Sequence, residues 1–316
     1  MGGSGALGFK SSSPPIMFAR EATTTDIDLV LRIFNEHSMS VAPELGTNGV
    51  AWAEDFIAGY PDANPAWILF DEEGGEAFAI GNLNPNSNSK RFQVDISILP
   101  ETDRLDEALG FFREQAKGFG DGWKFWITCN ITDERFNQLL IAEGFKVNRH
   151  FNSLRRELNS DSEPELPPNT SVRQLDLNSD SELKIMHTLR RDAFSKHFGF
   201  VPRPFEEYLA IARRDNLMKI SQVYLISENG IPAGYILIND EVAHELTGYV
   251  QNLGVSYAFQ GKGYGEYLLR KALAVYATRG FNLVDLGVDT GNESGALRLY
   301  EKVGFRRVTT WVQYED

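Results

Sequence analysis

Three glycines alternate with other residues in the second half of the chain, and their spacing is suited to binding an anion. The segment LGVSYAFQGKGYGEYLLRKALAVYATRG, residues 253–280, predicts a strand, a loop and a helix in that order. The loop glycines are Gly261, Gly263 and Gly265. Glycines at a helix start leave backbone N–H groups accessible, and these donors with the helix dipole favour a negatively charged ligand. We therefore expect a phosphate group here, with local positive charge from Lys262, Arg270 and Lys271.

The glycine pattern differs from two well-known nucleotide-binding loops. It lacks the G-x-G-x-x-G spacing of dinucleotide-binding folds, and no Ser or Thr follows a Gly-Lys pair as a P-loop requires. A tight connection between strand and helix without any ligand is an alternative, because a glycine-rich turn alone is a weak signal. The choice between these interpretations depends on what surrounds the loop.

The segment QGKGYG, residues 260–265, resembles the pyrophosphate loop of the GNAT superfamily of acyl-CoA-dependent N-acyltransferases. A second motif of that superfamily follows in order, since Asn292 precedes a helix ending in Leu-Tyr at Tyr300, and Gly304 with Phe305 come next. The resemblance implies an α+β fold with a mixed, mostly antiparallel central sheet flanked by helices. It also implies acetyl-CoA as the acyl donor.

The resemblance implies a role for each matching residue. Backbone groups of the strand at 253–255, splayed by a bulge, would bind the pantetheine arm and polarise the thioester carbonyl. Tyr300 would protonate the departing CoA thiolate, because a phenol with a pKa of about 10 suits a thiol with a pKa of about 8.5. Asn292 would cap the helix before Tyr300 and contact the pantetheine. The residues expected to bind the donor are Leu253, Gly254, Val255, Gln260, Gly261, Lys262, Gly263, Tyr264, Gly265, Glu266 and Asn292.

The general base and the acceptor site are assigned by position relative to these motifs. Glu245 precedes the strand that carries Leu253 and is our candidate base, with a surface carboxylate as the alternative. In the superfamily, the helices that wall the acceptor occupy the place of residues 190–208. His197, Phe198 and Arg203 are therefore the expected substrate-binding residues, with core packing as the alternative for this segment.

The elements that would position these residues occur twice along the chain. Aligning Gly304 and Phe305 with Gly144 and Phe145 superimposes a predicted helix on a helix and a strand on a strand. The segment NSDSEPELPPNT, residues 159–170, has three prolines and three acidic residues and is typical of an exposed linker. We predict a disordered leader at 1–16, a degenerate GNAT-like module at 17–158, this linker, and a catalytic GNAT module at 171–316.

The first module is predicted to be inactive for two reasons. Its equivalent of the phosphate loop, ETDRLDE at residues 101–107, has no glycine and four acidic residues, which would repel a pyrophosphate. The position of the catalytic tyrosine is occupied by Leu140. We expect this module to support or shape the acceptor cleft of the second module.

Composition limits the remaining classes of function. A formal net charge of -13 argues against nucleic acid and anionic membranes as partners. The single cysteine, Cys129, excludes an internal disulfide and fits a reducing, cytoplasmic compartment. The five scattered histidines show no ligand spacing, so no metal site is predicted. Neither the oligomeric state nor whether Met17 is the native start can be derived from these features.

The leading hypothesis is an N-acetyltransferase that transfers acetyl from acetyl-CoA to the amine of a small molecule. A narrower alternative is similarity to mycothiol synthases, which also contain two GNAT modules and acetylate desacetylmycothiol. An alternative of another class is a non-catalytic protein that binds CoA. The intact QGKGYG segment and Tyr300 favour an enzyme.

Overall fold

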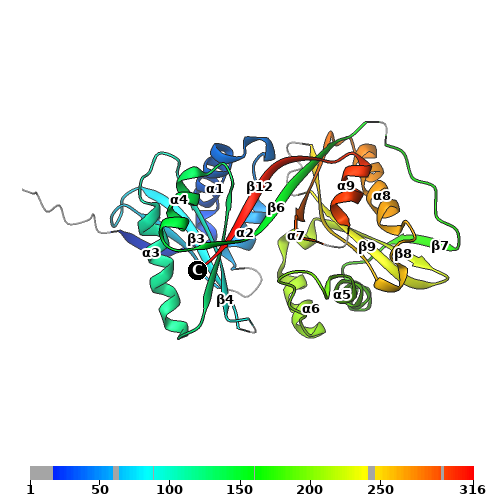
Figure 1. Ribbon diagram of the computed structural model, residues 1–316, viewed down its shortest axis with the longest axis horizontal. Helices are drawn as coiled ribbons and strands as arrows, with labels where there is room; N and C mark the ends of the chain where they lie inside the picture. Colours follow the sequence, from blue (N-terminus) through cyan, green and yellow to red (C-terminus); the bar gives the residue numbers. More distant parts are fainter. Residues whose placement is uncertain (1–16, 60–63, 88, 160, 241–245, 293–294) are drawn as a thin grey trace, which may run out of the picture.

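The computed structural model describes residues 17–59, 64–87, 89–159, 161–240, 246–292 and 295–316, and it contains two modules that lie side by side (Figure 1). The predicted leader at 1–16 lies outside the described residues. Among the residues that are described, no helix is both long enough and apolar enough to cross a bilayer.

The first half of the chain alternates helices with the strands of one sheet. Its elements are β1 (Phe18–Glu21), α1 (Ile27–Val41), α2 (Val50–Ile57), β2 (Ala66–Phe70), β3 (Ala77–Asn86), β4 (Arg91–Ile98), α3 (Leu105–Ala116), β5 (Lys124–Asn130), α4 (Glu134–Ala142) and β6 (Lys146–Glu157). Apolar and polar residues alternate along β4, and the apolar ones, Phe92, Val94, Ile96 and Ile98, are buried. This period of two is what buries one face of a strand under helices.

The second half repeats the plan. Its elements are β7 (Thr170–Gln174), α5 (Asp180–Phe194), α6 (Phe205–Arg214), α7 (Asn216–Lys219), β8 (Ser221–Glu228), β9 (Ile231–Asn239), β10 (Thr247–Val255), α8 (Tyr264–Thr278), β11 (Leu283–Asp289), α9 (Ala296–Val303) and β12 (Arg306–Glu315). The helix α8 ends at Arg279 and Gly280, where Gly280 has a left-handed φ of 81° as a C-terminal glycine requires.

The described strands form one 12-stranded sheet in the order β1-β2-β3-β4-β5-β12-β6-β11-β10-β9-β8-β7. Neighbouring strands are antiparallel except for the pairs β4–β5 and β10–β11, which are parallel. Helices cover both faces, so the predicted α+β fold with a mixed, mostly antiparallel sheet is confirmed (Figure 1).

The last strand of each half is exchanged between the modules. β6 leaves the first half to pair with β11, and β12 returns from the second half to pair with β5, so both strands cross between the modules in Figure 1. They also pair with each other, from Arg306 opposite Arg155 to Glu315 opposite Lys146. The proposed boundaries at 17–158 and 171–316 stay a prediction. The first segment lacks β12, which pairs with its strand β5, and the second lacks β6, which pairs with its strand β11.

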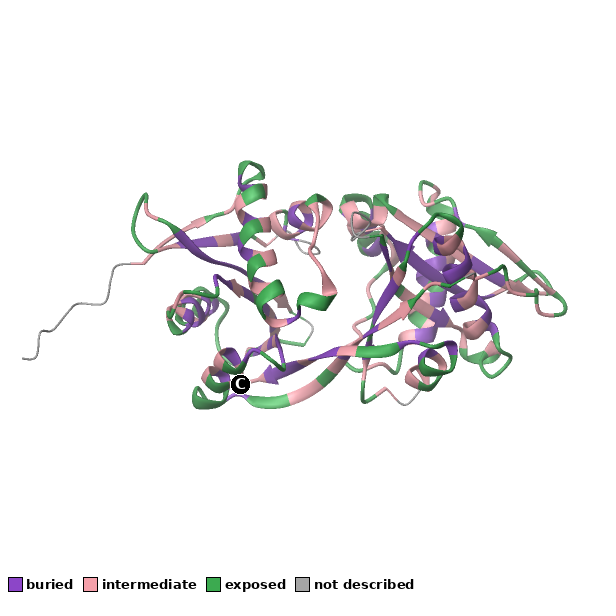
Figure 2. Cartoon of the chain, turned by 90° about the horizontal axis from the view of Figure 1, so that it is seen from above, coloured by how far each residue is buried: buried purple, intermediate pink, exposed green. Residues whose placement is uncertain are grey.

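The exchanged strands contribute side chains to the module that receives them. Val312 and Tyr314 of β12 are buried in the core of the first module, and Leu154 of β6 is buried in the core of the second. Figure 2 shows buried residues concentrated in two clusters, one in each module, with more exposed residues along the connecting strands. Each core is therefore completed by the other half of the chain.

Candidate active site

Two parallel strands of the second module separate part of the way along their length. β10 pairs with β11 only from Thr247 to Val250, although β10 stays paired with β9 as far as Val255. The β10–β9 register shifts between Val250 and Asn252, which makes Gln251 a bulge. Backbone groups of residues 251–255 therefore face an opening in the sheet. The bulge lies just before the predicted stretch at 253–255.

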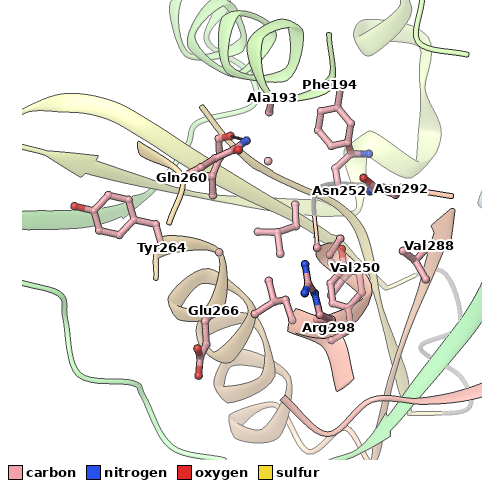
Figure 3. A pocket seen from close by; sticks show the side chains of 18 of the residues that line it. Ala193, Phe194, Val250, Asn252, Gln260, Tyr264, Glu266, Val288, Asn292 and Arg298 are labelled. Carbon is pink, nitrogen blue, oxygen red and sulfur yellow. Dashed lines mark hydrogen bonds between the residues drawn. The ribbon is translucent and has the colours of Figure 1, made fainter. Parts of the chain in front are cut away.

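A cavity of about 540 Å³ occupies this opening. Its walls are β10 residues 250–255, the glycine loop, the end of β11 at 287–289, α9 from residue 296 to 302, and the end of α5 (Figure 3). Its volume is within the range of small-molecule and cofactor sites. The cavity brings together all of the residues predicted to bind the donor except Lys262.

The glycine loop has the geometry of an anion site. Gly261 and Gly263 have φ values of 79° and 84°, in the left-handed region that glycine tolerates, and Gly263 is the N-cap residue of α8. A Cβ atom added to either residue would meet nothing within 4 Å, so their backbone is open to a ligand. The free N–H groups at the start of α8 thus face the cavity mouth.

The loop is fixed from α5 as well as from the sheet. The Asp192 carboxylate accepts a hydrogen bond from the Ser256 hydroxyl and another from the Tyr257 N–H group at 3.1 Å. The Ser256 N–H group donates to the carbonyl of Ala233 on β9 at 2.9 Å. The chain between β10 and α8 is therefore held in place before the first glycine.

The positive charge predicted at the loop is engaged in ion pairs, and its contact with the donor stays a prediction. Lys262 pairs with Glu228 at 2.7 Å and does not line the cavity. The other two pairs are Arg270 with Glu266 at 3.1 Å and Lys271 with Glu163 at 2.7 Å. These partners lie far away in the sequence or on the same helix, and the acidic chain supplies enough carboxylates to neutralise each cation.

A cation that the motif analysis missed lies at the cavity instead. Arg298, on the first turn of α9, is exposed, lines the cavity and points into it in Figure 3. No ion pair of Arg298 occurs among the described residues. The sequence feature that could have indicated this residue is its position two residues before Tyr300, on the helix of the Leu-Tyr motif. Arg298 leaves one unneutralised positive charge near the glycine loop.

Tyr264 and Glu266 turn their side chains away from the cavity in Figure 3, so only their backbone is available to a donor. The Glu266 carboxylate pairs with Arg270 and Lys302. The Gln260 amide donates to the Val255 carbonyl at 3.0 Å. The loop thus offers main-chain donors rather than side chains.

Tyr300 lies in the wall of the cavity, on the last turns of α9, with 8% of its surface exposed. Burial raises the pKa of its phenol to about 12, which keeps the hydroxyl protonated at neutral pH. No hydrogen bond from this hydroxyl to a protein group occurs among the described residues. A buried, protonated and unengaged donor therefore faces the opening.

The cap predicted for Asn292 is wrong. The N-cap residue of α9 is Gly295, with a φ of 80° and no side-chain capping bond. Asn292 lies in the turn before the helix, where its N–H group donates to the Asp289 carbonyl at 3.2 Å. Asn292 still lines the cavity, so its predicted contact with the donor stays a prediction.

The predicted acceptor residues separate into three places. His197 lines the cavity, and burial lowers the pKa of its imidazole below the ordinary 6.5. Arg203 pairs with Glu207 and lines a neighbouring cavity. Phe198 reaches neither cavity, because its ring stacks on Trp126 of the first module at 5.1 Å. The candidate base Glu245 lies outside the described residues.

The first module lacks the equivalent features. Its loop between β4 and α3 contains no glycine, and the Arg104 side chain at the N-cap of α3 binds the Glu107 carboxylate at 2.7 and 2.9 Å. Leu140 is fully buried in the core at the position of Tyr300. These features support the prediction that this module does not bind an acyl donor in the same way.

Comparisons with known proteins agree with this geometry. Residues 183–305 match the model of the acetyltransferase (GNAT) family. A mycothiol acetyltransferase of Beutenbergia cavernae is 32% identical over 108 residues, which are 34% of this chain and 36% of that protein. One from Streptosporangium roseum is 44% identical over 71 residues, 22% of this chain and 21% of that protein. The matched part thus spans about a third or less of the length of these curated relatives.

Solved structures match over nearly the whole chain. A tandem GNAT protein from the clavulanic acid biosynthesis pathway has a TM-score of 0.77 and 15% identity, covering 95% of this chain and 98% of that one. A GCN5-related N-acetyltransferase from Sphaerobacter thermophilus has a TM-score of 0.71 and 19% identity, covering 95% of each chain. At these identities the likeness shows the fold, and the resemblance expected from the two motifs is confirmed. The second module therefore belongs to the GNAT acetyltransferase family, and the chain as a whole has the tandem GNAT fold.

Proposed function

We propose that this protein transfers an acetyl group from acetyl-CoA to the amine of a small molecule, and that the second module performs the reaction. The observation that carries this proposal is the separation of β10 and β11, which joins the glycine loop to Tyr300 through one cavity. An acyl donor that binds its pyrophosphate at the loop and its thioester at the strand opening would lie along that cavity.

The residues present fit such a donor. The N–H groups at the start of α8 would bind the pyrophosphate, and Arg298 would add positive charge. Backbone groups of residues 252–254 that do not pair with β11 would bond to the pantetheine amides as a neighbouring strand does. A backbone N–H group near the bulge would polarise the thioester carbonyl, because negative charge develops on that oxygen during attack.

The chemical step needs two proton transfers. The nitrogen of the neutral acceptor amine attacks the thioester carbonyl carbon, a C–N bond forms, and the C–S bond breaks. The Tyr300 hydroxyl would give its proton to the departing sulfur, and the nitrogen loses a proton to a base. His197 is the candidate base within the described structure, since it lines the cavity and its lowered pKa leaves the imidazole neutral near pH 7. Glu245 remains the candidate from the sequence.

The acceptor is a separate question. The names of the two mycothiol acetyltransferases make desacetylmycothiol the first specific amine to test. A non-catalytic protein that binds CoA is the alternative of another class. It would bind acetyl-CoA without releasing CoA in the presence of any amine.

The test combines calorimetry of acetyl-CoA binding with release of free CoA thiol on a panel of small amines. We expect wild-type protein to bind acetyl-CoA and release thiol, and Tyr300→Phe to lower kcat about 100-fold with unchanged acetyl-CoA affinity. Tyr257→Phe, at an exposed phenol outside the cavity, is the control and should retain full activity. Failure of the wild type to bind acetyl-CoA would overturn the proposed function. Full activity of Tyr300→Phe would remove Tyr300 as the acid.

A further inference from the structure

A second cavity, of about 370 Å³, adjoins the donor cavity and is not explained by donor binding. Gln251 and Asn252 line both cavities, so the two meet at the bulge of β10. The other walls come from α5, α6, the segment between them and the start of α7, with Leu237 of β9 and Asn86 of β3 completing the lining. A molecule in this space would reach the point where the thioester is expected.

Arg190 places an unpaired guanidinium in the wall of this cavity. The described residues contain no carboxylate within 4 Å of it, and its recorded contact is with the ring of Phe200 at 6.0 Å. The other arginine of this wall, Arg203, pairs with Glu207. Asp215 contributes a carboxylate, but that group caps α7 by accepting the Met218 N–H group at 2.9 Å. Arg190 is thus available to an anion from outside the chain.

Tyr208 adds a second unsatisfied group to the same wall. Its side chain is 6% exposed, and its hydroxyl is buried without a hydrogen-bond partner. Burial raises the pKa of this phenol to about 12, while the nearby Arg190 lowers it to a smaller extent, so the hydroxyl remains a donor at neutral pH. A buried polar group without a partner costs free energy of folding, and such groups are rare in native proteins.

We propose that this cavity binds the carboxylate of the acceptor, and therefore that the acceptor is a small molecule carrying both an amine and a carboxylate. Arg190 would hold the carboxylate through its guanidinium, and the Tyr208 hydroxyl would donate the additional hydrogen bond. This inference rests on the proposed acetyl transfer, since it names the acceptor of that reaction. The carboxylate becomes the partner that both groups lack within the protein.

The spacing along α5 indicates the size of the acceptor. Arg190 lies four residues before Phe194, which lines the donor cavity, and residues at this spacing stack on one helix face about one turn apart. A carboxylate at Arg190 would thus lie on the order of 5 Å from the donor cavity. An amino acid or an acid of similar length fits this separation. A phosphate dianion fits poorly, because Asp215 is on the same wall and one arginine is its only unpaired cation in the described structure.

The test uses pairs of ligands that differ only in the acid group, namely α- and β-amino acids and their carboxamides, titrated into the full-length protein saturated with CoA. We expect binding of at least one amino acid, with its carboxamide weaker by about ten-fold or more. Arg190→Gln should weaken the amino acid about 10- to 100-fold and leave the carboxamide unchanged. Arg191→Gln, the same charge change at an exposed neighbour on α5, should bind like wild type.

Tyr208→Phe provides an independent variant that is expected to fold. Removing an unsatisfied hydroxyl should leave the melting temperature unchanged or higher, yet weaken the amino acid several-fold. The inference is overturned if no pair shows a preference for the acid that depends on Arg190. It is also overturned if wild type and Arg190→Gln acetylate desacetylmycothiol, which has no carboxylate, at equal and high rates. Loss of acetyl-CoA binding by wild type would instead refute the proposed function, and the same titrations without CoA would then decide whether Arg190 binds a carboxylate.

Discussion

A negative charge placed at the glycine loop tests whether this loop binds the pyrophosphate of the donor. Gly263 is the residue to change, because it is the N-cap of α8 and its backbone is open to solvent. We compare Gly263→Asp with Gly263→Asn. Both side chains have nearly the same shape and both tolerate the left-handed conformation better than other residues with a Cβ atom. The difference between the two variants is therefore the charge alone.

The expected size of the effect follows from Coulomb's law. A phosphate bound at the start of α8 would lie on the order of 5 Å from the new carboxylate. With an effective dielectric constant of about 60 for this exposed loop, each negative charge of the ligand adds roughly 1 kcal/mol of repulsion. The two charges of a pyrophosphate give about 2 kcal/mol, which weakens binding roughly 30-fold. Added salt screens such exposed charges and should reduce this factor.

Calorimetry of acetyl-CoA binding at low and at about 0.5 M salt measures this difference. We expect Gly263→Asn to bind within a few-fold of wild type and Gly263→Asp to bind about 30-fold more weakly at low salt. Equal affinities for the two variants, with both proteins folded, would show that the phosphates do not approach this loop. A difference that is unchanged by salt would show that the charge acts through protein structure rather than on the ligand.

Two further predictions concern pH and the exchanged strands. The acidic limb of kcat/KM should have its midpoint below pH 6.5, because burial lowers the pKa of His197 and the base works only when its imidazole is neutral. Activity is then lost as the pH falls through the pKa of His197. The variant His197→Gln should abolish this limb, and a limb that persists in the variant would exclude His197 as the base. Residues 17–158 and 171–316 expressed separately should each be unstable, because they lack β12 and β6 respectively, whereas co-expression should restore a heterodimer that gel filtration detects. Two independently stable, monomeric fragments would contradict the role given to the exchange.

The sequence was sufficient to predict the local backbone geometry around the glycine loop and the place of Tyr300 at a cavity. The spacing of Gly261 and Gly263 predicted an open backbone at a helix start, because this feature depends only on the left-handed conformation of these two glycines and on the helix that follows them. The Leu-Tyr motif likewise placed Tyr300 at the cavity, since a helix of known length ending at Gly304 fixes which residues face the sheet. Both inferences depend on contacts within about 15 residues of the chain.

Most features that the sequence did not reveal concern long-range contacts. The ion pairs of Lys262 with Glu228 and of Lys271 with Glu163 join distant segments, so no local pattern predicts that these cations are neutralised. The exchange of β6 and β12 is also invisible to periodicity, because either strand presents the same alternating face to either neighbour. Arg190 and Tyr208 were not singled out because each is an ordinary helix residue. Their significance lies in the partners that they lack.

The contacts between the modules give the first module a specific role in positioning the acceptor. The segment between α5 and α6 carries His197 toward the donor cavity, and it is held from outside the second module. Arg91 of β4 donates to the Gly199 carbonyl at 2.8 Å. The ring of Phe198 lies between two side chains of the first half of the chain. Trp126 of β5 stacks on it, and the guanidinium of Arg149 on β6 lies 4.3 Å from the centroid of the Phe198 ring.

These contacts explain why a module without a glycine loop or a catalytic tyrosine would be retained. Strands β4, β5 and β6 each contact the segment between α5 and α6, through Arg91, Trp126 and Arg149 respectively. The strand exchange fixes the distance between these strands and the donor cavity, because Arg149 of β6 also binds Asp289 at the end of β11 at 3.1 Å. One continuous sheet thus links the residues that would hold the acceptor to those that would hold the acyl donor. The exchange of strands would therefore help to position the acceptor next to the donor cavity, in addition to connecting two similar modules.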